Sequence, residues 1–367
     1  MPVQIIGMIQ HQRVSETHAP GGPTVDPEYV KTFAQAHEAG GFDRILVPQN
    51  ATSPSNIFGI AWAAAHTKQI KFLLAHRPGF VAPTLAARDI ATLDHYTGGR
   101  LAIHIISGGW DEDQRRDGDF LGHDERYERA DEYLDILKAI WTTDKPIDHK
   151  GKYYSFEGAY SEVKPLQQPH VPIYFGGASE AAIRVAGRHA DAYALWGETL
   201  EQAGEITRRI RDEVAKNGRS GPDFSVSFRP VLGKTSEEAW ARADRILQET
   251  RRLREARGLG RGEAFQSEGA RRLLAAAEKG TRLDKRLWTA IAAETGGRSN
   301  STALVGTAEE VADALLDYYD LGITTFLLRG FDPLEDAIEY GRDLIPLIRE
   351  KVSQRDQANG QAQLRRA

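Results

Sequence analysis

The chain has 367 residues, with 47 lysines and arginines against 52 aspartates and glutamates, and it contains no cysteine. The near balance of charge offers no basic surface for a polyanion, so we expect no nucleic-acid partner. The lack of cysteine excludes disulfides, thiolate metal sites and a cysteine nucleophile.

Short apolar runs and helical patterns alternate from one end of the chain to the other. The chain begins MPVQIIGMIQ, without a basic stretch before a long apolar core, and no apolar run reaches about 18–20 residues. We therefore expect no signal peptide, no membrane segment and a cytoplasmic location. The apolar runs predict strands that are buried on both faces, at residues 3–8, 44–47, 70–75, 101–106, 171–175, 192–195, 224–232 and 324–328.

Eight strand-then-helix units in succession predict a (β/α)8 TIM barrel over residues 1–350, as a single domain. A doubly wound open sheet is the alternative, and the lack of G-x-G-x-x-G after the first strand disfavours it. Residues 145–165 predict a small surface hairpin. The long segment at about 258–301 is rich in glycine and arginine and predicts a mobile lid before the last unit. Residues 351–367 form a polar C-terminal tail.

Two stretches suggest ligand contacts at the carboxyl ends of strands. The fourth predicted strand is interrupted by His104 and is followed by Ser107, where a barrel places its ligands. The sequence Phe175-Gly-Gly-Ala-Ser179 joins a strand to a helix, and its small residues would let an anion approach the helix N-terminus. A buried core histidine and an ordinary turn are the alternative interpretations.

Basic and amide side chains follow several other strands. Arg229 and Arg329 end the seventh and eighth strands, and Arg298 lies at the end of the insertion. Arginines that meet at one rim favour an anionic ligand, whereas Arg229 could instead pair with a carboxylate of a neighbouring loop. Further candidates at the strand ends are Gln10, His11, Gln49 and Trp196. The histidines lack metal-ligand spacing, so we expect no metal.

These sequences together resemble the bacterial luciferase-like flavin monooxygenases, and most of all the FMNH2-dependent alkanesulfonate monooxygenases. The resemblance extends from the first strand to the last helix. It rests on Phe72–Gly79, Pro83–Arg88, Thr92–Asp94, Gly98–Arg100, His123–Tyr127, Pro172–Ser179, Leu195–Glu198, Ser301–Gly306 and Gly330–Glu335.

The resemblance implies that reduced FMN, supplied by a separate NAD(P)H-dependent flavin reductase, is the cofactor. The residues that it implies for cofactor binding are His104, Ser107, Tyr127, Gly177, Ala178 and Ser179. For the substrate pocket, the resemblance implies His11, Trp196 and, approximately, Arg298. Together with the residues at the strand ends, this leads us to expect catalytic roles for Arg229, Arg298 and His11, and substrate binding by Gln10, Gln49, Trp196, Arg329 and Phe331. A homo-oligomer, dimeric or tetrameric, is expected as well.

The substrate residues depart from the sulfonate enzymes more than the flavin residues do. Thr52–Ser55 replaces their cysteine segment, Ser227-Phe-Arg229 replaces Arg-x-His, and Phe331 replaces tyrosine. In the flavin set, His104 replaces asparagine and Ser107 replaces threonine. We expect oxidative cleavage of the C–S bond of a small anionic organosulfonate, with a polar one such as sulfoquinovose as a candidate, giving an aldehyde and sulfite. An F420-dependent hydride-transfer enzyme, a flavin monooxygenase with a non-sulfonate substrate and a non-catalytic flavin-binding protein are the alternatives.

Overall fold

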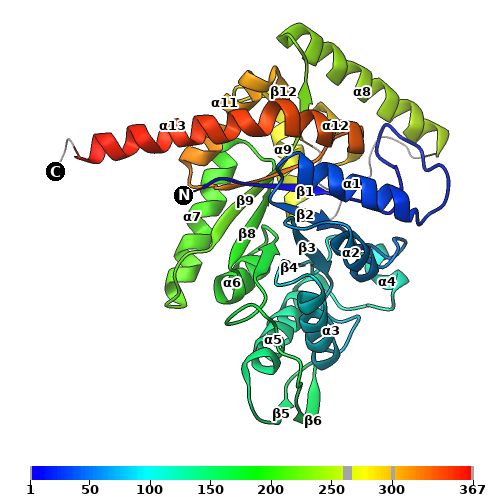
Figure 1. Ribbon diagram of the computed structural model, residues 1–367, viewed down its shortest axis with the longest axis vertical. Coiled ribbons are helices and arrows are strands. Elements are labelled where there is room, and N and C mark those ends of the chain that lie inside the picture. The colour runs from blue at the N-terminus through cyan, green and yellow to red at the C-terminus, as the bar shows by residue number, and fades with distance from the viewer. Residues whose placement is uncertain (1, 259–266, 299–301, 365–367) are drawn as a thin grey trace. The chain divides into compact units, whose positions relative to one another are not determined.

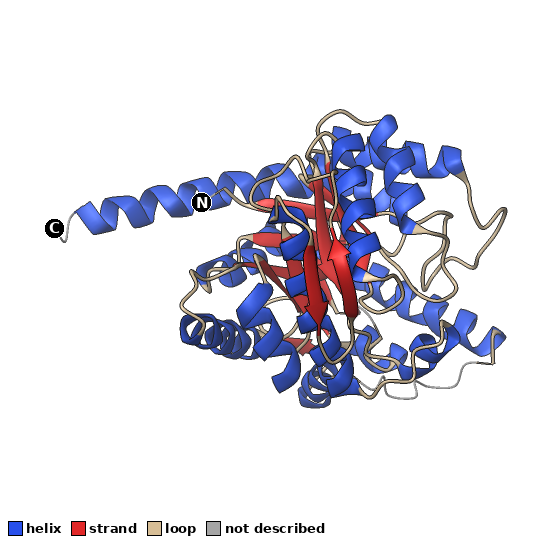
Figure 2. Cartoon of the chain, turned by 90° about the horizontal axis from the view of Figure 1, so that it is seen from below, coloured by secondary structure: helices blue, strands red, loops and turns tan. Residues whose placement is uncertain are grey.

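The computed structural model describes residues 2–258, 267–298 and 302–364. They group into two compact units, which we call unit 1 (Met1–Ile45, Ala194–Arg208 and Asp223–Ala367) and unit 2 (Leu46–Tyr193 and Arg209–Pro222). Figure 1 labels the helices and strands, and Figure 2 shows by colour how they alternate. The prediction of one domain over residues 1–350 stays a prediction.

Unit 2 contains a parallel sheet with β4 (Leu101–Ile105) between β3 (Lys71–His76) and β7 (Ile173–Gly176). In this register His104 lies opposite Ala75 on one side and Tyr174 on the other. The predicted hairpin is confirmed as an antiparallel pair, β5 (Ile147–Lys150) and β6 (Ser155–Ala159). The helices of this unit are α2 (Asn56–Ala65), α3 (Pro83–Tyr96), α4 (Asp111–Arg116), α5 (His123–Thr142) and α6 (Glu180–His189).

Unit 1 contains a further run of paired strands. Its parallel strands are β1 (Gln4–Met8), β13 (Thr325–Leu328), β9 (Asp223–Leu232) and β12 (Ala303–Gly306), in that order. The short strands β11 (Leu287–Trp288) and β10 (Arg282–Leu283) continue it in antiparallel fashion. The helices are α1 (Pro27–Ala39), α8 (Ser236–Ala256), α9 (Glu268–Lys279), α10 (Ala290–Thr295), α11 (Ala308–Asp320), α12 (Pro333–Glu339), the π-helix η1 (Tyr340–Leu344) and α13 (Ile345–Leu364).

Strand β9 changes partner halfway along its length. Its residues up to Phe228 pair with β13, and those from Arg229 onwards pair with β12. Arg229 therefore lies inside a long strand, whereas the sequence had placed it at a strand end. A side chain at such a junction is enclosed by its neighbours, and Arg229 is 0% exposed.

The architecture is a (β/α)8 barrel, as predicted, and the open-sheet alternative is wrong. The barrel strands are β1, β2 (Arg44–Val47), β3, β4, β7, β8 (Ala192–Trp196), β9 and β13. All eight had been predicted to within one or two residues of their observed bounds. Helix α7 (Leu200–Lys216) follows β8. Strand β12 and helix α4 had not been predicted as such.

The long insertion is folded wherever the structure describes it. Trp288 and Ile291 belong to a buried apolar cluster with Val231 and Ala239, so this part is built into the core of unit 1. Residues 259–266 and 299–301 of the predicted lid lie outside the described residues, and its mobility stays a prediction. The polar tail is helical as far as Leu364, where α13 extends from unit 1 (Figure 1). Within the described residues, no helix combines the length and apolar character needed to cross a membrane.

Candidate functional site

The strand β4 brings His104 and Ser107 to the loop that follows it in unit 2. Ser107 is buried, and neither its hydroxyl Oγ nor the buried Nδ1 of His104 has a hydrogen-bond partner among the described residues. Burial lowers the pKa of His104 to about 4, so its imidazole is neutral at physiological pH. Buried polar atoms are normally satisfied, so these two atoms are available to a ligand.

Arg126 of α5, which the sequence analysis had not singled out, holds this loop. Its guanidinium donates to the carbonyls of Ser107 (3.1 Å), Gly108 (3.1 Å) and Leu121 (2.7 Å), and to Asp111 Oδ1 (2.8 Å). The side chain is 2% exposed. A buried guanidinium with several hydrogen bonds fixes the backbone on both sides of Ser107. The sequence signal for Arg126 was its position next to Tyr127, within the stretch His123–Tyr127 that resembles the family.

The turn before α6 has the features of an anion cradle. Ser179 is the N-cap, and its hydroxyl accepts a hydrogen bond from Ala182 N at 3.2 Å. Gly177 has a φ of +127°, and a Cβ there would lie 2.7 Å from Tyr127 Oη and 2.8 Å from Ala182 Cβ. Only glycine fits such a position without strain. Ala178, between them, is half-buried.

Tyr127 and Tyr193 close the turn from within unit 2. Tyr193 Oη donates to the carbonyl of Gly177 at 2.5 Å. Burial, the largest influence, raises the pKa of Tyr127 to about 12, although a hydrogen bond with Ser179 opposes this rise. The phenol thus stays protonated and can donate. The structure thereby brings Tyr127, Gly177 and Ser179 together, as the sequence predicted.

Arg229 in unit 1 has partners of its own. Its Nη1 lies 2.7 Å from Glu16 Oε2, and its Nη2 donates to the carbonyl of Gly330 at 2.9 Å. The guanidinium carbon lies 3.6 Å from the centre of the Phe331 ring, a cation–π distance. The alternative that the sequence left open, a carboxylate from a neighbouring loop, is therefore what the structure shows.

Arg329 shares the same carboxylate. Its Nη2 lies 3.2 and 3.3 Å from the two oxygens of Glu16, and its side chain is 13% exposed. Burial alone would raise the pKa of Glu16, but the charges of Arg229 and Arg329 outweigh burial and lower the pKa to about 2. Glu16 is consequently ionised at any physiological pH. Its position in a polar stretch gave the sequence analysis no signal for this role.

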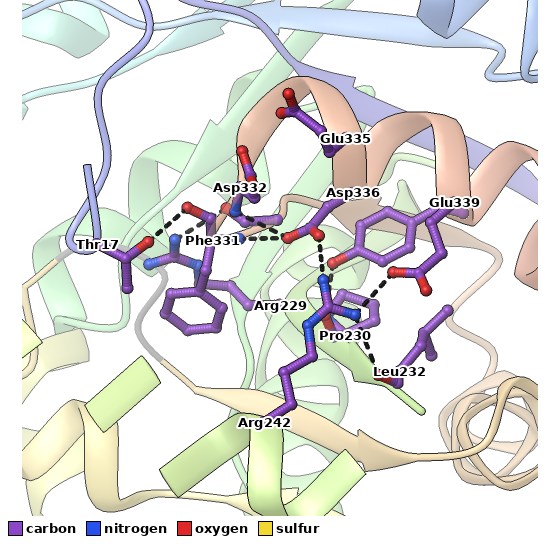
Figure 3. A network of polar contacts seen from close by, with 12 residues as sticks. Thr17, Arg229, Pro230, Leu232, Arg242, Phe331, Asp332, Glu335, Asp336 and Glu339 are labelled. Atoms are coloured by element: carbon purple, nitrogen blue, oxygen red, sulfur yellow. Dashed lines mark hydrogen bonds and ion pairs between the residues drawn. The ribbon is translucent and has the colours of Figure 1, made fainter. Parts of the chain in front are cut away.

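The loop that carries Phe331 is held by a network of polar contacts (Figure 3). Asp336 accepts hydrogen bonds from Phe331 N (2.7 Å) and Asp332 N (2.9 Å), and Arg242 donates to Asp336 Oδ1 at 2.5 Å. Phe331 itself is 2% exposed and part of the apolar core. Its ring supports Arg229, so in this structure it lies below the guanidinium and not at a free surface.

The remaining predicted residues of unit 1 are dispersed over several elements. Trp196 ends β8, and a Cβ added to Gly269 would lie 2.9 Å from its ring, so the first turn of α9 covers it. His11 Nε2 and Gln10 Oε1 are buried and have no hydrogen-bond partner among the described residues. Burial also lowers the pKa of His11. Arg298 is half-buried after α10.

The insertion is anchored by an ion pair that the sequence analysis missed. Arg272 of α9 donates from Nε and Nη2 to Glu198, with distances of 2.7–3.0 Å, and from Nη1 to Glu205 at 3.0 Å. Both Arg272 and Glu198 are buried.

In unit 2, Gln49 is half-buried after β2. Among the described residues, no group of three His, Asp or Glu side chains could hold a metal ion.

Comparisons with known proteins agree with this architecture. The family model described as luciferase-like monooxygenase matches residues 3–325. The chain is similar to riboflavin lyase (RcaE), whose structure holds modified FMN and the substrate riboflavin, at 21% identity and a TM-score of 0.79, covering 96% of this chain and 92% of that one. DmoA from Hyphomicrobium sulfonivorans is 23% identical with a TM-score of 0.75, covering 95% and 88%.

A further similar structure is that of an F420-dependent secondary alcohol dehydrogenase in complex with an F420-acetone adduct. It is 17% identical with a TM-score of 0.71, and covers 95% of this chain and 99% of that one. At these identities the likeness to the solved structures concerns the fold, whereas the family model, which spans most of the chain, shows the family. The chain belongs to the luciferase-like monooxygenase family.

Proposed function

We propose that the protein is an FMNH2- and O2-dependent monooxygenase that cleaves the C–S bond of a small organosulfonate. The observation that carries the cofactor assignment is in unit 2, where the turn at Gly177 with its positive φ, the N-terminus of α6 and the unpartnered hydroxyl of Ser107 occur together. A flavin reductase that uses NAD(P)H would supply the FMNH2.

The residues of unit 2 fit FMN. The turn at Ala178 and Ser179 leads into the N-terminus of a ten-residue helix, where backbone N–H groups favour a phosphate. Tyr127, kept protonated by its raised pKa, can donate to the same anion. Ser107 and the neutral imidazole of His104 can satisfy polar groups of a ring system. Reduced FMN, when bound, supplies the two electrons that activate O2.

The overall stoichiometry follows from the proposed cleavage. A sulfonate R–CH2–SO3⁻ with FMNH2 and O2 gives R–CHO, HSO3⁻, FMN and water. One oxygen atom enters the carbon that bore sulfur, the C–S bond breaks, and the electron pair of that bond leaves with sulfite. The protein must hold the sulfonate and exclude water, because a dry site strengthens each of its electrostatic contacts.

Arg329 is the arginine of unit 1 that suits the substrate anion. Only its Nη2 side is engaged by Glu16, and among the described residues no side chain or carbonyl accepts from its Nε or Nη1. Arg229, by contrast, is enclosed and paired. Arg329 is 13% exposed, and its Nε and Nη1 can each donate a hydrogen bond to an oxygen of a sulfonate; this is why we assign the anion to Arg329.

Sulfite release tests the proposed function. The protein would be incubated with a flavin reductase, NAD(P)H, FMN and a panel of sulfonates that includes simple alkyl and polyhydroxylated members. We expect sulfite and aldehyde in equal amounts from at least one sulfonate. Oxygen uptake without sulfite would indicate a monooxygenase with another substrate. Tight binding of F420 with no binding of reduced FMN would replace the proposal with hydride transfer, and FMN binding without oxygen uptake would indicate a non-catalytic protein.

A further inference from the structure

We propose that Glu16 makes the anion site of Arg329 selective for singly charged anions over doubly charged ones. This inference rests on the proposed function, because it specifies the charge of the substrate group that Arg329 would bind. It concerns a residue to which neither the sequence motifs nor the family likeness assigns a role.

Charge counting within the cluster gives the selectivity. Arg229 and Arg329 are both cations, and burial lowers the pKa of Arg229 only to about 10. Glu16 contributes one negative charge to the pair, at 2.7 Å from Arg229 and 3.2 Å from Arg329. The cluster of these three side chains therefore carries one net positive charge. A monoanion neutralises it, whereas a dianion leaves one uncompensated negative charge close to a carboxylate.

Glu16 cannot simply move aside for a second charge. The hydroxyls of its two neighbours, Ser15 and Thr17, both donate to the carbonyl of Phe331, at 2.6 and 2.9 Å. The carbonyl belongs to the loop that Asp336 and Arg242 hold from the other side (Figure 3). Displacing the carboxylate would also leave Arg229 buried with an unpaired charge, which is strongly unfavourable.

Charged side chains near this cluster also disfavour the binding of a dianion. Arg13 lies 2.7 Å from Asp332 and 3.4 Å from Glu335, so these three side chains carry a net negative charge. They are 34–53% exposed and screened by solvent, and Glu335 in addition has a raised pKa, chiefly through its hydrogen bond with Asp332. They can weaken the binding of a dianion further, but Glu16 is the carboxylate in direct contact with both arginines.

The test compares two probes of the same shape and different charge. Propanesulfonate and propylphosphonate, the latter at a pH where it is doubly ionised, would be titrated into the wild-type protein in the presence of FMN, with binding followed by calorimetry. We expect the sulfonate to bind at least about tenfold more tightly. The substitution Glu16→Gln raises the net charge of the cluster to two, and we expect it to remove or reverse this preference.

Two further variants keep the test decisive. Glu339→Gln removes a carboxylate that pairs with Arg242 at 2.8 Å, so it makes the same charge change outside the cluster and should keep the wild-type preference. The double variant Glu16→Gln/Arg229→Met restores a net charge of one, removes the unpaired buried arginine that could prevent folding, and should recover the preference for the sulfonate.

A folded Glu16→Gln protein with the wild-type preference would overturn the inference, and so would a double variant that still favours the phosphonate. The measurement needs no turnover. A monoanion preference without sulfite release would therefore count against the proposed function alone, whereas sulfite release with no preference between the two probes would count against the role of Glu16.

Discussion

The two units differ in the charge of their predicted site residues. In unit 2, the residues predicted for the flavin include a serine hydroxyl and a histidine nitrogen that no described residue satisfies. In unit 1, Arg229 and Arg329 are paired with Glu16, and His11 and Gln10 are neutral residues that each have a buried atom without a partner among the described residues. Burying an unpaired charge costs far more than burying an unpaired neutral group. Charges are therefore balanced within the fold, and neutral groups can be left for a ligand.

Replacing Arg229 with methionine is expected to have the largest effect among the tests of this contrast. Because Arg229 is fully buried and paired, we expect Arg229→Met to lower the free energy of unfolding by about 3–5 kcal/mol, as measured by urea denaturation. Arg329→Met is the matched control. That side chain is 13% exposed, and its loss leaves Glu16 paired with Arg229, so we expect a smaller loss of stability. Equal losses of stability in the two variants would refute the distinction between a structural and a ligand-facing arginine.

A carboxylate at position 179 tests the predicted flavin site of unit 2. Aspartate caps a helix about as well as serine does, so Ser179→Asp should fold normally. Its charge would oppose the FMN phosphate, and we expect the affinity for FMN, measured by flavin fluorescence, to fall about a hundredfold, or about 2.7 kcal/mol. Ser179→Asn keeps the cap without the charge and should bind nearly as wild type. Unchanged affinity in the aspartate variant would place the phosphate elsewhere.

The smallest effect concerns the dependence of stability on pH. The pKa of His104 falls from 6.5 to about 4 on folding because the ring is buried. Above pH 6.5 the imidazole is neutral in both states and contributes nothing to the pH dependence. Between pH 6.5 and 4 only the unfolded chain takes up the proton, so stability falls as the pH is lowered, by about 2.5 kcal/mol at pH 4.5.

Asparagine, which the sulfonate enzymes carry at this position, does not titrate. We therefore expect His104→Asn and the wild type to have parallel stability curves above pH 7, and the wild type alone to lose this increment by pH 4.5. Thermal denaturation across this range measures it. A constant difference between the two proteins at every pH would mean that His104 is protonated to the same extent in the folded and unfolded states.

Local patterns accounted for most of the barrel and for the turn that is predicted to bind the flavin phosphate. Runs such as residues 101–106 are apolar on both faces and bounded by turns, which defines a buried parallel strand without knowledge of its neighbours. The turn at Gly177 is equally local, because a strand, two glycines and an N-capping serine follow one another directly. Arg126 was missed because nothing in its sequence shows that its acceptors would be backbone carbonyls 5–19 residues away.

The sequence by itself determined the order of strands and helices and the family, because periodicity, caps and motifs are properties of neighbouring residues. Only the tertiary structure decided what the arginines do. Glu16 and Arg229 are separated by more than two hundred residues, yet their charges lie 2.7 Å apart. Likewise, the pairing of β9 first with β13 and then with β12 buries Arg229 completely. Coulombic interactions depend on distance in space, and the folded chain alone sets that distance.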